Sequence, residues 1–243
     1  KDKTVVFTID QKNYKIGDEI IETDVAPYIK DLGNGGGRTM VPVAYVAPAL
    51  GTEPARWYPN DRLVLITKGD KQIAVFIDKK ELLVNGKKMP MDVAAEITDI
   101  GNGGRTMLPI AFIAKALEVG YEWDEAARSV YFYGYSRIYD QKGTFGPEYG
   151  IETIDGNVVV KTDEVTLQNM LIKGNLTIAE EVGEGDVTLN NITVKGETYI
   201  RGGGKDSIHI NGGQYSNIII QNVHGAIRGV DTDVTGAQIV VAE

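Results

Sequence analysis

Few residues in this sequence have the types and spacing that metal or acid–base chemistry requires. The chain contains no cysteine and only two histidines, His209 and His224, which is too little imidazole for a copper centre. His209 alternates with isoleucines in a strand pattern and is expected to point outward. The close acidic pair Asp231 and Asp233 is the one calcium candidate, although such residues are more typical of turns. We therefore expect no catalytic residue, no cofactor and no enzymatic activity.

Charge is distributed unevenly along the chain. The net charge is −9, and residues 135–243 contain 8 Lys or Arg against 15 Asp or Glu, so −7 of it lies in this half. Nucleic-acid affinity depends on basic side chains that neutralise phosphates, which this balance disfavours. No apolar run reaches the roughly 20 residues of a membrane span. We expect a secreted, soluble protein with neither nucleic acid nor a membrane span.

The first half of the chain is an internal duplication. Asp24-Val25-Ala26-Pro27 returns later in the chain as Asp92-Val93-Ala94-Ala95. Arg38-Thr39-Met40-Val41-Pro42 returns as Arg105-Thr106-Met107-Leu108-Pro109, at a slightly shorter offset because the preceding glycine-rich loop has lost one glycine. Agreement over a whole unit, with slips only at loops, indicates two copies of one structural unit.

Each copy has the same expected order of elements. Alternating apolar residues predict a strand at its start, as in Val5-Val6-Phe7-Thr8-Ile9. Apolar residues at spacings of three and four predict short helices over 43–50 and 110–117. A closing strand completes a β-β-α-β unit of an α+β domain. Trp57 and Trp123 occupy equivalent positions and are expected to pack beneath the helices.

A shorter repeat follows in the second half. Val165-Thr166-Leu167 returns as Val187-Thr188-Leu189 and again as Ile208-His209-Ile210, so the three copies are almost evenly spaced. This period is typical of one coil of a parallel β-helix, whose alternate side chains would form interior columns. We expect a short helix of four coils, right-handed as parallel crossovers usually are. Three amides share one register and are expected to form a ladder at a corner: Gln168, Asn190 and Asn211.

These patterns predict four segments and a mixed architecture, an α+β N-terminal domain followed by an all-β parallel β-helix. Glycines, charges and tyrosines between the two repeat regions indicate a linker that packs against a neighbour. The expected segments are 1–68 for the first repeat, 69–134 for the second, 135–156 for the tyrosine-rich linker and 157–243 for the β-helix.

The motifs of the duplicated half resemble the copper amine oxidase N-terminal-like domain. The resemblance rests on the Asp-Val-Ala-Pro and Gly-Arg-Thr-Met-Val-Pro motifs, a helix ending in Ala-Leu, and the tryptophan that precedes the last strand. It covers residues 4–134, with Ala95 in place of the motif proline in the second copy. The resemblance implies a stalk-like, non-catalytic domain, which occurs as tandem copies in secreted and cell-surface proteins of Gram-positive bacteria.

The C-terminal sequence suggests self-association. Ile239, Val240 and Val241 form a bare apolar strand at the end of the β-helix, where an unpaired edge can accept another chain. We expect this strand to join copies into a fibre or surface layer. The alternative is a carbohydrate- or cell-wall-binding adhesion module that contacts polysaccharide through exposed aromatic side chains. Its candidate residues are Tyr135, Tyr139, Tyr149, Tyr199 and Tyr215.

Overall fold

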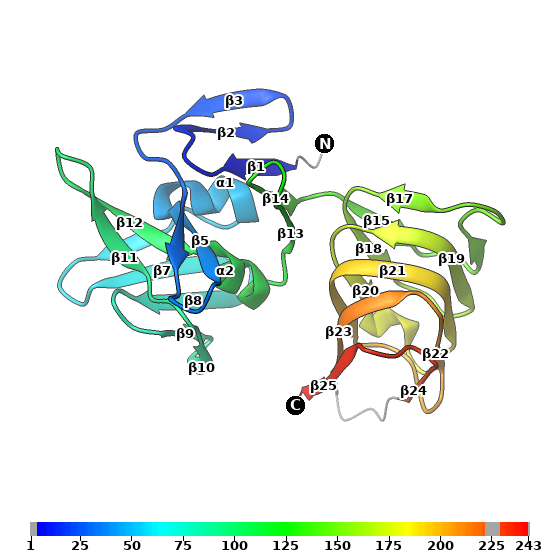
Figure 1. Cartoon of the computed structure of the whole chain (residues 1–243). Coiled ribbons are helices and arrows are strands. Elements are labelled where there is room, and N and C mark those ends of the chain that lie inside the picture. The colour runs from blue at the N-terminus through cyan, green and yellow to red at the C-terminus, as the bar shows by residue number, and fades with distance from the viewer. Residues whose placement is uncertain (1–3, 222–228, 243) are drawn as a thin grey trace. The chain divides into compact units, whose positions relative to one another are not determined.

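The structure, a computed structural model, describes residues 4–221 and 229–242, so His224 lies outside the described residues. These residues form two compact units that are mostly β (Figure 1). The N-terminal unit contains the described residues up to 134 except 120–122, and the solenoid unit contains 120–122 and the residues from 135 onward. Among the described residues, no helix is long and apolar enough to cross a lipid bilayer.

The N-terminal unit has seven strands in each repeat rather than the three of the expected β-β-α-β pattern. The short strands around the glycine-rich loops account for the difference. In the first repeat the elements are β1 (Val5–Thr8), β2 (Asn13–Ile16), β3 (Glu19–Glu22), β4 (Tyr28–Asp31), β5 (Gly37–Pro42), η1 (Val43–Tyr45), α1 (Val46–Leu50), β6 (Arg56–Tyr58) and β7 (Leu63–Lys68). In the second they are β8 (Lys71–Phe76), β9 (Glu81–Val84), β10 (Lys87–Pro90), β11 (Glu96–Asp99), β12 (Gly104–Pro109), α2 (Ile110–Ala116), β13 (Gly120–Asp124) and β14 (Ser129–Tyr133).

The strands of the two repeats are interleaved in three sheets. One sheet has the order β13-β14-β1-β2-β3, the second β10-β9-β8-β7-β6, and the third β11-β12-β5-β4. Each sheet therefore contains strands from both repeats. The predicted boundary between residues 68 and 69 falls at the turn between β7 and β8, but the strands on either side of it pair in one sheet.

Helices form where the apolar stripes were predicted; the stripe of the second helix is buried, while Val43 and Ala47 of the first are partly exposed. The buried helical side chains are Val46, Ala49 and Leu50 in α1 and Ile110, Ile113, Ala114 and Ala116 in α2. The expected position of the tryptophans beneath the helices is wrong. Trp57 lies on β6 with 41% of its surface exposed. Trp123 lies on β13, and its indole Nε1 donates a hydrogen bond to Glu125. Both lie on the strand that precedes the closing strand of their repeat.

The solenoid unit is a stack of parallel strands (Figure 1). Its strands and single 3-10 turn run in chain order around successive coils, and every pairing between its described strands is parallel. The elements are β15 (Ser136–Tyr139), β16 (Gly143–Phe145), β17 (Glu152–Ile154), β18 (Asn157–Val160), β19 (Val165–Ile172), β20 (Leu176–Ile178), η2 (Glu180–Val182), β21 (Val187–Ile200), β22 (Ile208–Asn211), β23 (Gln214–Gln221), β24 (Val230–Thr232) and β25 (Gln238–Ala242).

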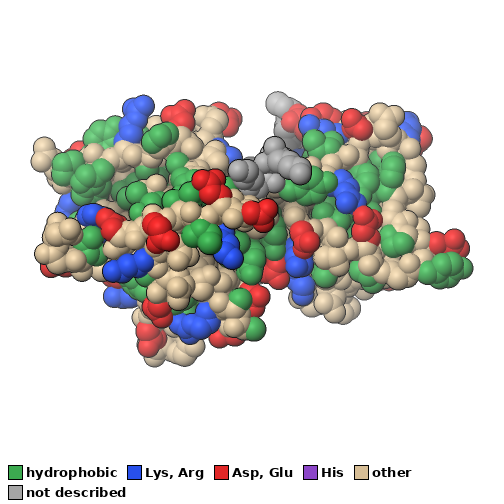
Figure 2. All heavy atoms as spheres, turned by 90° about the horizontal axis from the view of Figure 1, so that it is seen from above, with side chains coloured by type: hydrophobic (Ala, Val, Ile, Leu, Met, Phe, Trp, Pro, Cys, Tyr) green, Lys and Arg blue, Asp and Glu red, His purple; other side chains and the backbone are tan. Residues whose placement is uncertain are grey.

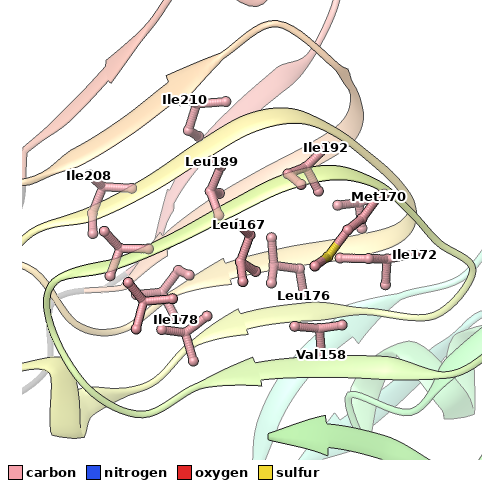
Figure 3. Packing of buried hydrophobic residues seen from close by; sticks show 14 of the residues in the cluster. Val158, Leu167, Met170, Ile172, Leu176, Ile178, Leu189, Ile192, Ile208 and Ile210 are labelled. Carbon is pink, nitrogen blue, oxygen red and sulfur yellow. The ribbon is translucent and has the colours of Figure 1, made fainter. Parts of the chain in front are cut away.

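The predicted interior columns are confirmed. Leu167 pairs with Leu189, and Leu189 pairs with Ile210, each 0% exposed. A parallel column of the same face contains Val165, Val187 and Ile208. Figure 3 shows Leu167, Leu189, Ile208 and Ile210 pointing into one core, which side chains from the other faces of the coil complete. Burying each such side chain contributes roughly 1.5–3 kcal/mol, so this core holds the coils together.

The segment 135–156, expected to be a linker, instead forms the first coil of the solenoid. β15 pairs with β18, while β16 and β17 both pair with β19. Polar residues at interior positions hide the strand alternation in this segment. With this coil and the strands β24 and β25, the described residues stack six strands on the face from β15 to β25 and five on the face from β16 to β24, more than the expected four coils.

The predicted amide ladder forms in part. Asn211 Nδ2 donates to Asn190 Oδ1 at 2.9 Å, but Gln168 Nε2 donates to the carbonyl of Pro147 at 3.2 Å. A second rung links Asn191 Nδ2 to Asn169 Oδ1 at 2.8 Å. Both of these asparagines have positive φ, of 55° and 53°, a conformation that asparagine tolerates better than most residues. The asparagines therefore make the corner and link adjacent coils at the same time.

Candidate functional site at the ends of the solenoid

The last coil presents an open sheet edge. β24 pairs with β22 and β25 pairs with β23, and neither has a second partner among the described residues. The register of β25 is fixed by Ile218 opposite Ile239 and Ile220 opposite Val241. Backbone N–H and C=O groups on the far side of both strands are thus available to another chain.

Two apolar side chains of the last coil continue the interior columns. Ile239 stacks on Ile218, which is 0% exposed, yet Ile239 itself is 50% exposed. Val241 occupies the next interior position and is 73% exposed. Val240 lies between them, points to the outer face and is 38% exposed. The core of the solenoid is consequently uncovered at this end in the described residues.

The first coil ends in an ion pair instead of aliphatic side chains. Arg137 lies opposite Val158 and Glu152 lies opposite Met170, so both occupy positions that are interior in the next coil. Their side chains form a salt bridge, Arg137 Nη1 to Glu152 Oε1, at 2.5 Å. The Glu152 carboxylate, followed by Tyr135 and Tyr139, raises the pKa of Arg137. The pair thus places satisfied charges where the column ends.

An aromatic pair accompanies this ion pair. Tyr139 lies opposite Val160, and Phe145 lies opposite Leu167. Their ring centroids are 4.9 Å apart, and Phe145 packs against the buried core. The two ends of the solenoid therefore differ: the first coil carries aromatic rings, an ion pair and the buried Ile154, while the isoleucine and valine of the last coil are exposed. Sequence reasoning missed this difference. Extending the strand register by one coil toward the N-terminus from Val158 would have placed Arg137 at an interior position.

Three of the five tyrosines proposed to contact glycans are buried. Tyr139, Tyr199 and Tyr215 are 8%, 4% and 7% exposed, which leaves no ring face for a polysaccharide. Tyr135 is 38% exposed and Tyr149 is 84% exposed. Tyr139 and Tyr215 belong to the interior core, whereas Tyr199 is buried although the interior positions of its strand are Thr198 and Ile200. Residue type alone predicts neither the side of a strand nor what covers it.

Tyr215 belongs to the interior of the solenoid. It pairs in register with buried Val194, and its hydroxyl has no hydrogen-bond partner among the described residues. Burial raises the pKa of this phenol. Tyr215 thus serves packing and offers no accessible group for chemistry.

The two calcium candidates, Asp231 and Asp233, contact different residues. The Asp233 carboxylate accepts a hydrogen bond from the Gly212 amide at 2.7 Å. Asp231 Oδ2 lies 3.8 Å from Nδ1 of His209, which occupies the outward position next to it. Over residues 4–221 and 229–242, no group of three or more His, Asp or Glu side chains is arranged to hold a metal ion. Asp233 therefore stabilises a turn between coils.

Charged side chains of both signs are interspersed on the face shown in Figure 2, with hydrophobic groups between them.

Comparison with known families gives one result that concerns the N-terminal unit. Residues 33–132 match the family model described as the copper amine oxidase N-terminal domain. No curated protein and no solved structure gives a match to this chain.

Proposed function

We propose, on the premise that residues 33–132 match an N-terminal and not a catalytic domain of amine oxidases, that this protein is a non-enzymatic extracellular surface protein. In this proposal the α+β repeats are a stalk-like module, and copies associate through the last coil of the solenoid into a fibre or surface layer. The observation that carries the proposal is the exposure of Ile239 and Val241 at positions that are interior one coil earlier.

An uncovered last coil has two physical reasons to bind another strand. Within the described part of the chain, no strand pairs with the outer edges of β24 and β25, and added strands would satisfy their backbone groups at a spacing of about 4.8 Å. The exposed aliphatic side chains would at the same time leave water. A second copy supplies both kinds of contact with one surface.

The first coil of a second copy is the best-matched occupant. Residues 229–242 contain two aspartates and no Lys or Arg, so two last coils facing each other would repel. The first coil, residues 135–156, is also net acidic, but it carries two cations, Arg137 and Lys142, which the last coil lacks. The rings of Tyr139 and Phe145 supply apolar surface there. A contact between unlike ends does not close on itself and propagates into a filament.

The test uses paired lysine substitutions on β25. Val241→Lys places a charge in the interior column, whereas Val240→Lys places the same charge on the outer face of the same strand. Sedimentation velocity over a wide concentration range, followed by electron microscopy, should show association for the unmodified chain and for Val240→Lys. Val241→Lys should remain monomeric with an unchanged circular dichroism spectrum. An unmodified chain that stays monomeric at high concentration would refute the proposal.

Glycan binding is the second candidate, supported by the 84% exposure of Tyr149. It predicts a monomeric protein that sediments with insoluble cell-wall polysaccharide. Tyr149→Ala should abolish that binding, while Tyr215→Phe, which alters a buried hydroxyl, should leave it intact.

A further inference from the structure

The N-terminal unit is built by an exchange of strands between its two repeats. β1, β2 and β3 of the first repeat are completed by β14 and β13 of the second. β8, β9 and β10 of the second repeat are completed by β7 and β6 of the first. Each repeat thus contributes three strands to one five-stranded sheet and two strands to the other. Neither repeat contains a complete five-stranded sheet of its own.

The two exchanged contacts have the same register. In one sheet Val5 pairs with Phe132 and Phe7 pairs with Val130. In the other, the equivalent residues Ile73 and Val75 pair with Ile66 and Val64. This identity indicates a pseudo-two-fold relation between the repeats, with the β7–β8 turn as a covalent link on one side only.

The axis of this relation passes through the third sheet. β12 and β5 are antiparallel, and Leu108 lies opposite Val41, its own counterpart in the duplication. Both side chains are 0% exposed. A residue that pairs with its own equivalent is the signature of an isologous interface, in which one surface binds another copy of itself.

The duplicated motifs supply ion pairs across this interface. Arg38 of the first repeat binds Asp92 of the second through two hydrogen bonds, at 2.6 and 3.0 Å. Arg105 of the second repeat binds Asp24 of the first, its Nη2 lying 2.5 Å from Oδ2. The motif arginine of each repeat therefore binds the motif aspartate of the other repeat and not its own.

A second reciprocal set lies at the edge of the exchanged strands. Arg62 Nη2 is 2.6 Å from Asp78 Oδ2, and the equivalent Arg128 Nη2 is 3.9 Å from Asp10 Oδ2. The backbone repeats the relation: the Ile77 amide donates to the Arg62 carbonyl at 2.9 Å, as the equivalent amide in the other repeat does to the carbonyl of Arg128. All four ion pairs join one repeat to the other.

We infer that each repeat is a pairing module whose partner is another repeat of the same kind, and that the motif Asp and Arg recognise that partner. In this chain the two-residue turn Gly69-Asp70 supplies the partner within the same molecule. A second copy of the chain can present the same surface, so two molecules can exchange repeats and form a closed dimer. This inference concerns the N-terminal unit and does not depend on the proposed role of the solenoid.

Removing the turn tests the exchange in the full chain. Lys68 pairs with Lys71, so deletion of Gly69 and Asp70 leaves no residues to close the β7–β8 hairpin. Each repeat should then find its partner in a second molecule. The expected product is a folded dimer of twice the 26.4 kDa chain mass. The substitution Val241→Lys is included so that any association through the solenoid is separately removed. A folded monomer would overturn the inference.

A charge exchange tests recognition and decides the matter if the shortened chain does not fold. In the intact chain, Arg38→Asp should lower the melting temperature by about 2–4 °C. Adding Asp92→Arg, in the other repeat, should restore at least half of that loss. The matched control Arg38→Asp with Asp24→Arg, both in the first repeat, should lower the melting temperature further. Equal recovery in the control would overturn the inference.

The same charges can direct pairing between molecules. One shortened chain carries Arg38→Asp and Arg105→Asp, and the other carries Asp24→Arg and Asp92→Arg. Only the mixed dimer restores all four oppositely charged contacts. Native mass spectrometry should therefore show the mixed dimer rising from the half expected of random mixing to roughly nine-tenths. A random distribution would contradict partner recognition by these residues.

Discussion

Adjacent glycines at one corner of the solenoid provide a matched test of how closely its coils approach. Gly212 and Gly213 follow β22, and both have positive φ, of 65° and 82°. A Cβ added at Gly212 would meet nothing within 4 Å. A Cβ added at Gly213 would lie 2.0 Å from the carbonyl oxygen of Ile192 in the preceding coil. The two positions thus share a positive φ but differ in the room they leave for a Cβ atom.

The expected free energies follow from this difference. Gly212→Ala imposes a left-handed conformation on alanine and should cost about 1–2 kcal/mol. Gly213→Ala imposes the same conformation and also forces the Ile192 backbone to move, because a carbonyl cannot give way as a flexible side chain does. We expect a total cost of about 4 kcal/mol or more, in the range that indicates a local steric conflict.

Hydrogen exchange measured by mass spectrometry is the suitable assay. Both tryptophans lie in the N-terminal unit, so their fluorescence would not report on this corner. The difference of about 3 kcal/mol between the variants corresponds to roughly a hundredfold faster exchange in β21 and β23 for Gly213→Ala. Similar exchange rates in the two variants would refute the argument that the coils meet at this backbone contact.

Other predictions concern the core, alkaline pH and metals. Leu189→Ala should cost about 2–5 kcal/mol because its side chain is 0% exposed, whereas Thr188→Ala on the outer face should cost less than about 1 kcal/mol; urea denaturation followed by circular dichroism measures both. Burial, then the hydrogen bond to Glu96, raises the pKa of Tyr28 from 10.0 to about 12. This contribution to stability is complete below pH 10 and is lost as the pH rises through about 12, so Tyr28→Phe should flatten the alkaline loss of stability in urea titrations between pH 8 and 12. Copper, calcium or a chelator should leave the melting temperature within about 1 °C, since a ligand that binds the native state would raise it; a rise of several degrees would reveal a metal site.

The sequence predicts the solenoid columns well because its period and its alternation agree. Leu167, Leu189 and Ile210 recur with the spacing of one coil and with apolar neighbours two residues away, and this is sufficient to define a register. The first coil escapes the same reasoning because Arg137 and Glu152 are charged residues at interior positions. A pattern based on hydrophobicity cannot identify a strand whose inward side chains form an ion pair.

The exchange between repeats is invisible to sequence analysis for a different reason. Because β1 and β8 are copies of each other, the pattern of β7 fits either strand equally well. β7 pairs with β8 because the turn between them is short. β1 and β14, the copies of β8 and β7, then pair with each other. The motif residues Arg38 and Asp92 are recognisable as conspicuous charges, but their partners depend on this choice.

The pairing of β1 with β14 also determines how mechanical tension would pass through the N-terminal unit. Val5, where β1 begins, lies opposite Phe132, near the end of β14, so the chain enters and leaves this unit at neighbouring points. Pulling those points apart loads the hydrogen bonds of the ladder one after another rather than all at once. The other two sheets thus carry no load until this ladder has opened. In a chain held at both ends, β1 and β14 would separate first, and the few hydrogen bonds between them would set the force at which the unit begins to unfold.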